Sequence, residues 1–294
     1  MKISANGLSI EVDDQGPANG PAVLLIMGLG MQLVAWPDEL VADLVGRGFR
    51  VVRFDNRDIG LSQHFDAADT PSVPMAAMRY ALHLKVRSPY TLRDMAADAV
   101  GVLDALGIAQ AHVVGASMGG MIAQHLAASH AARVRSLVLV MTSAGARELP
   151  QPSLAVRQAM LGRPQAPGPD AVVAHLQRLW RVIGSPAYAP DPQRLQQRLL
   201  ATVQRSWHPE GTARQLLAVM ADGDRTPLLA RISAPTSVIH GEADPLIPVE
   251  AGHHLVRHIA GAQGDFIPGM GHDLPLPLLP RIAAVIAQTA ARAG

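Results

Sequence analysis

Residues 113–121 read Val-Val-Gly-Ala-Ser-Met-Gly-Gly-Met and place Ser117 in a Gly-x-Ser-x-Gly pattern between an apolar run and a helical run. The pattern predicts a sharp strand-to-helix turn, because a serine at its apex needs small residues two positions away on either side. The helix that follows would present free amides and the positive end of its dipole to a developing negative charge. This stretch therefore predicts a nucleophilic serine; the plainer alternative is a glycine-rich turn in a nucleotide-binding sheet.

Around this turn, short apolar runs alternate with longer helical stretches, which is the pattern of an α/β protein. Continuous apolar runs are typical of strands covered on both faces, and helices repeat apolar residues every three or four positions. The expected strands lie at residues 8–12, 22–27, 50–54, 111–115, 134–141, 236–240 and 264–267, and the expected helices include 91–106, 118–131 and 278–292. The sequence predicts a mostly parallel central sheet flanked by helices.

One long stretch, residues 147–223, lacks strand-like runs and carries helical segments instead. The prolines that follow Gly168 and Asp191 have the chemistry of a first helical position behind a cap residue. We expect these segments to form an inserted helical cap, or lid. The α/β core would then consist of residues 1–146 and 224–294.

Composition excludes several classes of function. The 294 residues include 25 Lys plus Arg and 24 Asp plus Glu, so no basic surface for nucleic acid is expected. The absence of cysteine removes disulfides, thiolate nucleophiles and thiolate metal sites. The first seven residues lack an apolar signal core, and no apolar run approaches the ~20 residues that cross a bilayer. We expect a soluble cytoplasmic protein without a nucleic-acid or membrane partner.

A serine hydroxyl is a poor nucleophile at neutral pH, so this interpretation requires an acid and then a histidine further along the chain. His272 lies in a glycine-rich loop after the last expected strand, where sheets of this kind keep their chemistry. Asp244 lies in the loop after the preceding strand and is the expected acid, with Glu242 in the same loop as the alternative. No carboxylate directly follows the strand that ends at Met141. We expect Ser117, His272 and Asp244 to form one site.

The other histidines give no metal-binding pattern. No HxH or HExxH spacing occurs, and the adjacent His253 and His254 on one expected helix cannot converge on one ion. His125 and His258 are also expected on helices. We expect neither a metal nor another cofactor.

Acyl transfer also needs backbone donors for the oxyanion, usually the amide after the serine and one from the loop after an early strand. The amides of Met118 and Leu29 are the candidates, and Gly28 and Gly30 would let the backbone approach the substrate. A dinucleotide-binding fingerprint does not fit the same loop, because its third glycine would fall on Leu33.

Taken in order, these motifs resemble the α/β-hydrolase superfamily over essentially the whole chain, which implies that fold. By this resemblance, the Asp-Asn-Arg-Asp-Ile-Gly turn at residues 55–60 braces the site without taking part in the chemistry. Three segments resemble the esterase-type branch that includes aclacinomycin methylesterase-like proteins: IMGLGMQLVAWPDEL (26–40), RFDNRDIGLS (53–62) and PGMGHDLP (268–275). Met27 stands where the superfamily commonly has histidine before the glycine, which removes a polar side chain but keeps the amides.

The sequence therefore predicts a serine esterase that needs no cofactor and acts on a small-molecule ester. Ser117 would attack, His272 would shuttle the proton and Asp244 would orient the imidazole. The serine argues against the dehalogenase and epoxide-hydrolase branches, which use a carboxylate nucleophile. Lactonase, thioesterase, perhydrolase and carbon-carbon hydrolase chemistry use the same groups and stay open. The alternative from another class is a small-molecule binding module without turnover.

Substrate preference is expected to come from the cap. Residues 147–222 carry nine arginines, no lysine and five acidic residues, and we expect the arginines on outer helix faces. Trp180 and Trp207 are expected to face the substrate, within an inward apolar set: Met160, Leu176, Leu179, Trp180, Leu199, Leu200, Trp207, Leu217 and Met220. This predicts a small to medium, largely apolar ester. Residues 64–89 are interrupted by prolines and are expected to form a second flap.

Overall fold

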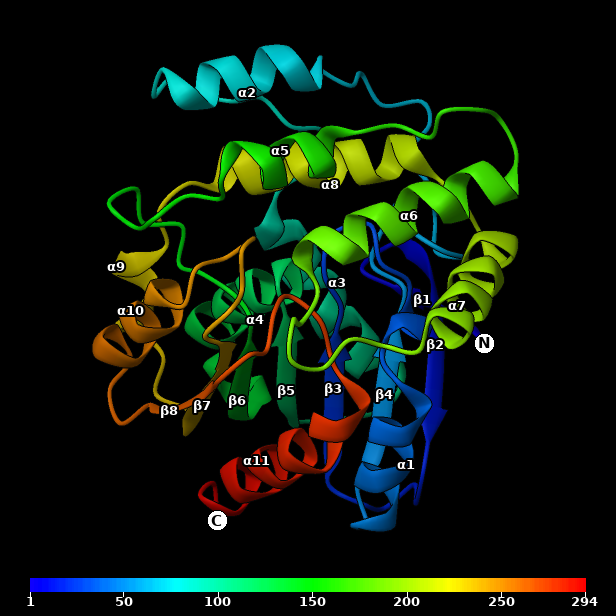
Figure 1. Ribbon diagram of the computed structural model, residues 1–294. Helices are drawn as coiled ribbons and strands as arrows, with labels where there is room; N and C mark the ends of the chain where they lie inside the picture. Colours follow the sequence, from blue (N-terminus) through cyan, green and yellow to red (C-terminus); the bar gives the residue numbers. More distant parts are fainter.

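An eight-stranded sheet runs through the centre of the computed structural model, which describes residues 1–294 (Figure 1). Its order is β1-β2-β4-β3-β5-β6-β7-β8, and every neighbouring pair is parallel except β1-β2 and β2-β4. The strands are β1 (Lys2–Ala5), β2 (Leu8–Gln15), β3 (Ala22–Ile26), β4 (Arg50–Phe54), β5 (Ala111–Ala116), β6 (Val134–Val140), β7 (Thr236–Gly241) and β8 (Gln263–Ile267). The predicted mostly parallel sheet is confirmed.

Strand β1 is the one strand that the sequence analysis does not predict. It forms a hairpin with β2 through Asn6 and Gly7, whose φ angles are 51° and 76°. Asn-Gly is a strong signal for such a turn, because both positions need a positive φ. The hairpin was therefore readable from the sequence.

Helices cover both faces of the sheet. Successive strand residues point to opposite faces, so Leu24 and Val113 belong to one buried cluster, whereas Val23 and Val114 belong to the other. Residues of α3, α4 and α10 complete the first cluster, and residues of α1 and α11 complete the second. These helices and the shorter ones of the core are α1 (Asp38–Gly46), α3 (Leu92–Ala105), α4 (Met118–Ser129), α9 (Thr226–Leu229), α10 (Glu250–His258), α11 (Leu279–Ala291), η1 (Leu33–Ala35), η2 (Ala131–Arg133) and η3 (Leu276–Leu278).

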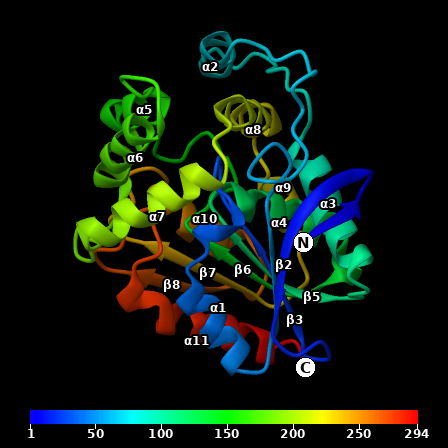
Figure 2. The same cartoon turned by 90° about the vertical axis from the view of Figure 1, so that its right-hand side faces the viewer.

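Four further helices follow β6 and precede β7, and they lie above the carboxyl ends of the strands (Figure 1). They are α5 (Leu154–Leu161), α6 (Pro169–Ile183), α7 (Pro192–Arg205) and α8 (Pro209–Asp222). Residues 147–223, which carry these four helices, are called the cap. Helix α2 (Val73–Ala81), from the stretch expected to form a flap, packs against α8, as Figure 2 shows at the top of the molecule. None of the helices combines the length and apolar character that crossing a membrane requires.

Candidate active site

Ser117 occupies the turn between β5 and α4 with a φ of 54° and a ψ of −122°. This is a strained conformation for a residue with a Cβ, and such strain persists only where the surrounding structure fixes it. The flanking glycines are required by close backbone contacts. A Cβ at Gly115 would lie 2.4 Å from the Gly119 carbonyl oxygen, and one at Gly119 would lie 2.0 Å from that of Ile26.

The structure brings Ser117, His272 and Asp244 together from three separate loops. His272 Nε2 lies 3.0 Å from Ser117 Oγ, and His272 Nδ1 lies 2.7 Å from Asp244 Oδ2. The other Asp244 oxygen accepts the amides of Leu246 and Ile247 at 2.9 and 2.8 Å. With its Nδ1 proton donated to the carboxylate, the imidazole is oriented so that Nε2 can accept the serine proton.

The alternative acid, Glu242, is exposed to solvent, whereas Asp244 is buried. A further residue, His240, lies next to Asp244 and was not predicted from the sequence. Its Nε2 donates to the Ile247 carbonyl at 2.8 Å and lies 3.7 Å from Asp244 Oδ2. Burial lowers the pKa of His240, which keeps this second imidazole neutral. A histidine next to the apolar pair Val238 and Ile239 of strand β7 was the only available signal.

The loop that carries His272 is held by the end of cap helix α6. The His272 amide donates to the Ile183 carbonyl at 2.7 Å, and the Gly271 amide donates to Ser185 Oγ at 2.8 Å. The Ser185 hydroxyl in turn donates to the carboxylate of Asp273, whose pKa is raised by burial. These contacts could not be predicted from the sequence, because Ser185 and His272 lie far apart along the chain.

The expected oxyanion loop lies directly beside the serine. A Cβ at Gly28 would lie 3.1 Å from the Ser117 Cβ, so no larger residue fits without displacement. The amides of Leu29 and Met118 donate to no acceptor within the protein. The Gly30 amide differs, because it donates to Gln215 Oε1 at 2.9 Å. The loop therefore offers Leu29, and not Gly30, as a free donor.

The turn at residues 55–60 makes hydrogen bonds to residues in and next to the oxyanion loop. The fully buried Asp55 accepts the Leu33 amide at 2.7 Å and the Leu61 amide at 2.9 Å. Asn56 Nδ2 donates to the Met27 carbonyl at 2.9 Å. Burial raises the pKa of Asp55, while these amides and the Arg205 charge oppose the rise.

The expectation that the cap arginines lie on outer faces is wrong for three of them. Arg205 pairs with Asp55 at 2.8 Å, and Arg214, itself buried, makes two 2.8 Å hydrogen bonds to Asp58. Arg198 lies 5.9 Å from the centre of the Trp180 ring. Asp55 and Asp58 are fully buried carboxylates, and such groups need a positive partner.

These contacts determine whether the Asp58 carboxyl group is ionised. Burial alone would raise the pKa of Asp58, but the hydrogen bonds from Arg214 and the Phe65 amide, together with the positive charge of Arg214, help to hold the pKa below its usual value. The carboxylate is therefore ionised and joins the cap to the core through its pairing with Arg214.

Two cavities lie under and beside the cap. One of about 50 Å³ lies between the oxyanion loop and helices α6 and α7, and its lining includes Gly30, Trp180 and Trp207. A more open cavity of about 490 Å³ borders the segment 164–169 and shares Trp207 with the first. Trp207 is 42% exposed, contrary to the expected inward placement, because it lies on the connection between α7 and α8. Ser117 is not among the lining residues of either cavity.

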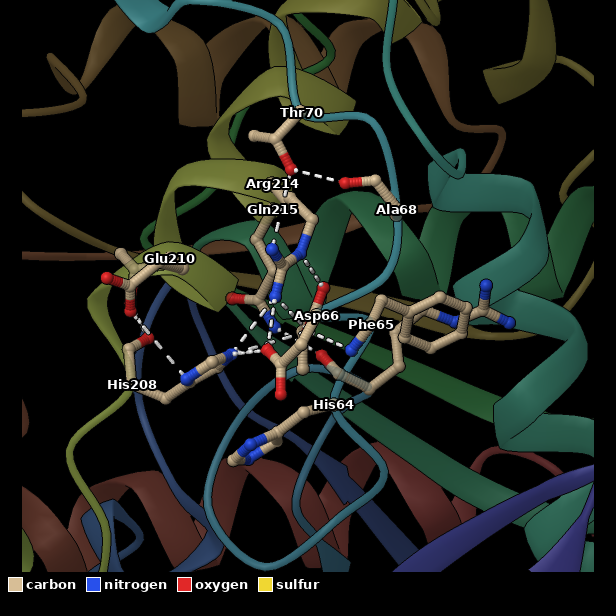
Figure 3. A network of polar contacts seen from close by, with 12 residues as sticks. His64, Phe65, Asp66, Ala68, Thr70, His208, Glu210, Arg214 and Gln215 are labelled. Carbon is tan, nitrogen blue, oxygen red and sulfur yellow. Dashed lines mark hydrogen bonds and ion pairs between the residues drawn. The ribbon is translucent and has the colours of Figure 1, made fainter.

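One group of side chains has the composition of a metal site, namely His64, Asp66 and His208 (Figure 3). A guanidinium already lies among their ligand atoms, since Arg214 is 3.0 Å from His208 Nε2 and 3.3 Å from Asp66 Oδ1. A cation bound here would face this positive charge. The imidazoles of His64 and His208 also stack with their centres 3.9 Å apart.

Comparisons with known proteins agree with this geometry. The alpha/beta hydrolase fold family matches residues 21–276. Rhodomycin D methylesterase DauP of Streptomyces sp. (strain C5) is 31% identical over 289 residues, which cover 92% of this chain and 90% of that protein. 3-Oxoadipate enol-lactonase 1 of Acinetobacter baylyi is 27% identical over 91% of this chain and 88% of its own. The crystal structure of the enol-lactonase from Burkholderia xenovorans LB400 superimposes with a TM-score of 0.74 at 23% identity, covering 99% of this chain and 100% of that one. The chain therefore belongs to the α/β hydrolase family, and its esterase-type relatives include rhodomycin D methylesterases.

Proposed function

We propose that this protein is a serine esterase that cleaves a small to medium, largely apolar carboxylic ester through an acyl-enzyme. The family and the methylesterase relatives make the protein a carboxylic ester hydrolase. The observation that carries the finer proposal is the hydrogen-bonded series from Ser117 through His272 to Asp244.

The reaction follows from the order of these groups. Ser117 Oγ attacks the ester carbonyl carbon while its proton passes to His272 Nε2. The tetrahedral intermediate collapses, the bond to the alkoxide breaks, and His272 returns the proton to the departing oxygen. A water molecule, deprotonated by the same imidazole, then attacks the acyl-enzyme; the bond to Ser117 Oγ breaks, His272 returns the proton to that oxygen, and the acid is released. Asp244 holds the imidazole in position and stabilises the imidazolium that forms in each half.

The amides of Leu29 and Met118 are the proposed donors to the oxyanion. Both lie beside Ser117 in the chain or in space, and neither has an acceptor within the protein. Met118 is also the first residue of α4, where the helix dipole favours negative charge. A pair of fixed donors of this kind stabilises the transition state more than the substrate.

The proposed substrate preference rests on the cap. Gly28, Gly30 and Trp180 are the proposed contacts, and Gly30 and Trp180 line the cavity that adjoins the oxyanion loop. Most of the cap arginines are exposed or engaged by buried carboxylates. The apolar side chains of α6 and α7 are therefore the groups proposed to contact the acyl or alcohol part of the ester.

A lactone is a cyclic ester that the same groups would open, and the enol-lactonase among the relatives favours including one in the assay. The experiment is hydrolysis of p-nitrophenyl acetate, p-nitrophenyl butyrate and γ-butyrolactone by the wild type and by Ser117→Ala. The proposal predicts turnover that Ser117→Ala reduces by about 10⁶-fold, the size of the loss when a catalytic serine is removed. Turnover that survives in Ser117→Ala, measured on a folded variant, would refute it.

A further inference from the structure

Cap helix α8 reaches the oxyanion loop through a single buried amide side chain. Gln215 is fully buried, its Oε1 accepts the Gly30 amide at 2.9 Å, and its Nε2 donates to the Arg57 carbonyl at 2.9 Å. One side chain thus joins the cap to the oxyanion loop and to the turn at residues 55–60. Figure 3 shows Gln215 beside Arg214, both on α8.

Helix α8 packs closely against both of these segments. Gly30 has a φ of 68°, and a Cβ added there would lie 2.8 Å from the Thr212 side chain. A Cβ at Gly211 would lie 2.0 Å from the Asp58 carbonyl oxygen. The two hydrogen bonds between Arg214 and Asp58 hold the helix at this position. These three contacts of α8 therefore hold Gln215 in position against Gly30.

The contact determines which amides of the loop are free. The Met31 amide donates back to the Gly28 carbonyl at 3.2 Å, the Leu33 amide donates to Asp55, and the Gly30 amide donates to Gln215. The Leu29 amide, which has no acceptor within the protein, is the proposed oxyanion donor. Because successive peptide planes share a Cα, holding the Gly30 amide also limits rotation of the peptide before it.

We propose that Gln215 is a positioning residue for ester hydrolysis, which holds the Gly30 peptide and thereby aims the Leu29 amide at the oxyanion. The inference rests on the proposed function, because it presupposes that the oxyanion forms next to Ser117. Gln215 itself touches neither substrate nor the reacting atoms. Its contribution passes through Gly30, so the cap takes part in assembling the oxyanion site as well as in covering the substrate.

The test uses two substitutions at Gln215 and one control. Gln215→Met keeps the length of the side chain but removes both hydrogen bonds. Gln215→Glu keeps an acceptor for the Gly30 amide, and its protonated form also donates to the Arg57 carbonyl. Gln197→Leu, an exposed glutamine on α7, is the control. All rates are expressed per active site, counted by end-point titration with a fluorophosphonate, so that loss of folded protein does not alter them.

For Gln215→Met we expect kcat to fall about 10- to 100-fold with KM changed less than about twofold, because a misplaced donor weakens only the transition state. Affinity for a trifluoromethyl ketone, which forms a hemiketal oxyanion on the serine, should fall by the same factor as kcat/KM. Affinity for the matching secondary alcohol should not change. A purely structural role would lower the melting temperature but leave these per-site ratios at the wild-type value.

For Gln215→Glu the activity relative to wild type should rise as the pH is lowered from 8 to 6, because burial favours the protonated carboxyl that restores both hydrogen bonds. If Gln215→Met does not fold, the pH dependence of Gln215→Glu tests the inference by itself. Wild-type kcat in Gln215→Met, or a Gln215→Glu to wild-type ratio that does not vary with pH, would overturn the inference while leaving the proposed function intact. Failure of the proposed function would appear instead as a wild-type enzyme whose turnover does not depend on Ser117.

Discussion

Arg205 of the cap and Asp55 of the core form an ion pair of 2.8 Å in which the carboxylate is fully buried. Asp55 also accepts two amides, one of which belongs to the residue that ends the oxyanion loop, Leu33. The same guanidinium donates to Gln32 Oε1. One carboxylate therefore takes part both in docking of the cap and in support of the oxyanion loop.

Replacing Arg205 by Met should lower the free energy of unfolding by roughly 2–3 kcal/mol, because it leaves a buried carboxylate without its positive partner. The figure lies at the lower end for buried pairs, since the Arg205 side chain is 20% exposed. Urea unfolding measures it. Arg47→Met, which breaks an exposed pair with Asp43, is the control and should cost less than about 1 kcal/mol. Equal losses in the two variants would contradict the assigned role of the buried pair.

Asp244→Asn should reduce kcat by about 10³- to 10⁴-fold, less than Ser117→Ala, because the carboxylate orients the imidazole but forms no bond to the substrate. Glu242→Gln is the matched control, since Glu242 lies in the same loop with its side chain in solvent. Steady-state hydrolysis of a p-nitrophenyl ester measures both. A silent Asp244→Asn together with an impaired Glu242→Gln would show that the wrong acid has been chosen.

Burial of His112 is expected to make part of the free energy of unfolding depend on pH. Burial lowers the pKa of His112 to about 4, below its ordinary value near 6.5. The unfolded chain therefore binds more protons between these values, so the neutral imidazole contributes fully above about pH 6.5 and its contribution is lost as the pH falls toward 4.

Between pH 7.5 and pH 5, the wild type should lose about 2 kcal/mol more stability than His112→Asn, which does not titrate in this range. Urea unfolding at the two pH values gives the comparison, and the other histidines cancel because both proteins contain them. The same loss in His112→Asn as in the wild type would mean that His112 is not the group responsible.

The cap predicts the order of substrates. Short and medium p-nitrophenyl esters should be hydrolysed faster than long-chain triglycerides or anionic esters, because the cap lies over the oxyanion loop and the cavity between them is partly apolar. A chain-length series of kcat/KM values measures this order. Preference for an anionic ester that disappears at high salt would contradict it and would assign the half-buried Arg198 to substrate recognition.

Local sequence signals were enough to predict the turn at Ser117, the parallel sheet and the positions of His272 and Asp244. Each of these depends on a strand followed by a short loop of distinctive composition. The partners of Arg205, Arg214 and Gln215 were not predictable in this way, because each contact joins segments more than 140 residues apart.

The error over the cap arginines has the same origin. Helical periodicity shows that one face of a helix is charged, but it does not show whether that face contacts a buried carboxylate. Asp55 and Asp58 lie in a turn whose sequence suggested only a structural brace. Their burial, and hence their need for a positive partner, depends on how the cap packs and could be known only from the structure.

The central claim is that Ser117 is the nucleophile activated by His272. Its most direct test is the intact mass of the protein after treatment with a fluorophosphonate, followed by peptide mapping. One covalent adduct per chain is expected, on Ser117, which is absent in Ser117→Ala and forms far more slowly in His272→Ala. Wild-type protein that hydrolyses esters without acquiring this adduct, or that acquires it on another residue, would contradict the account.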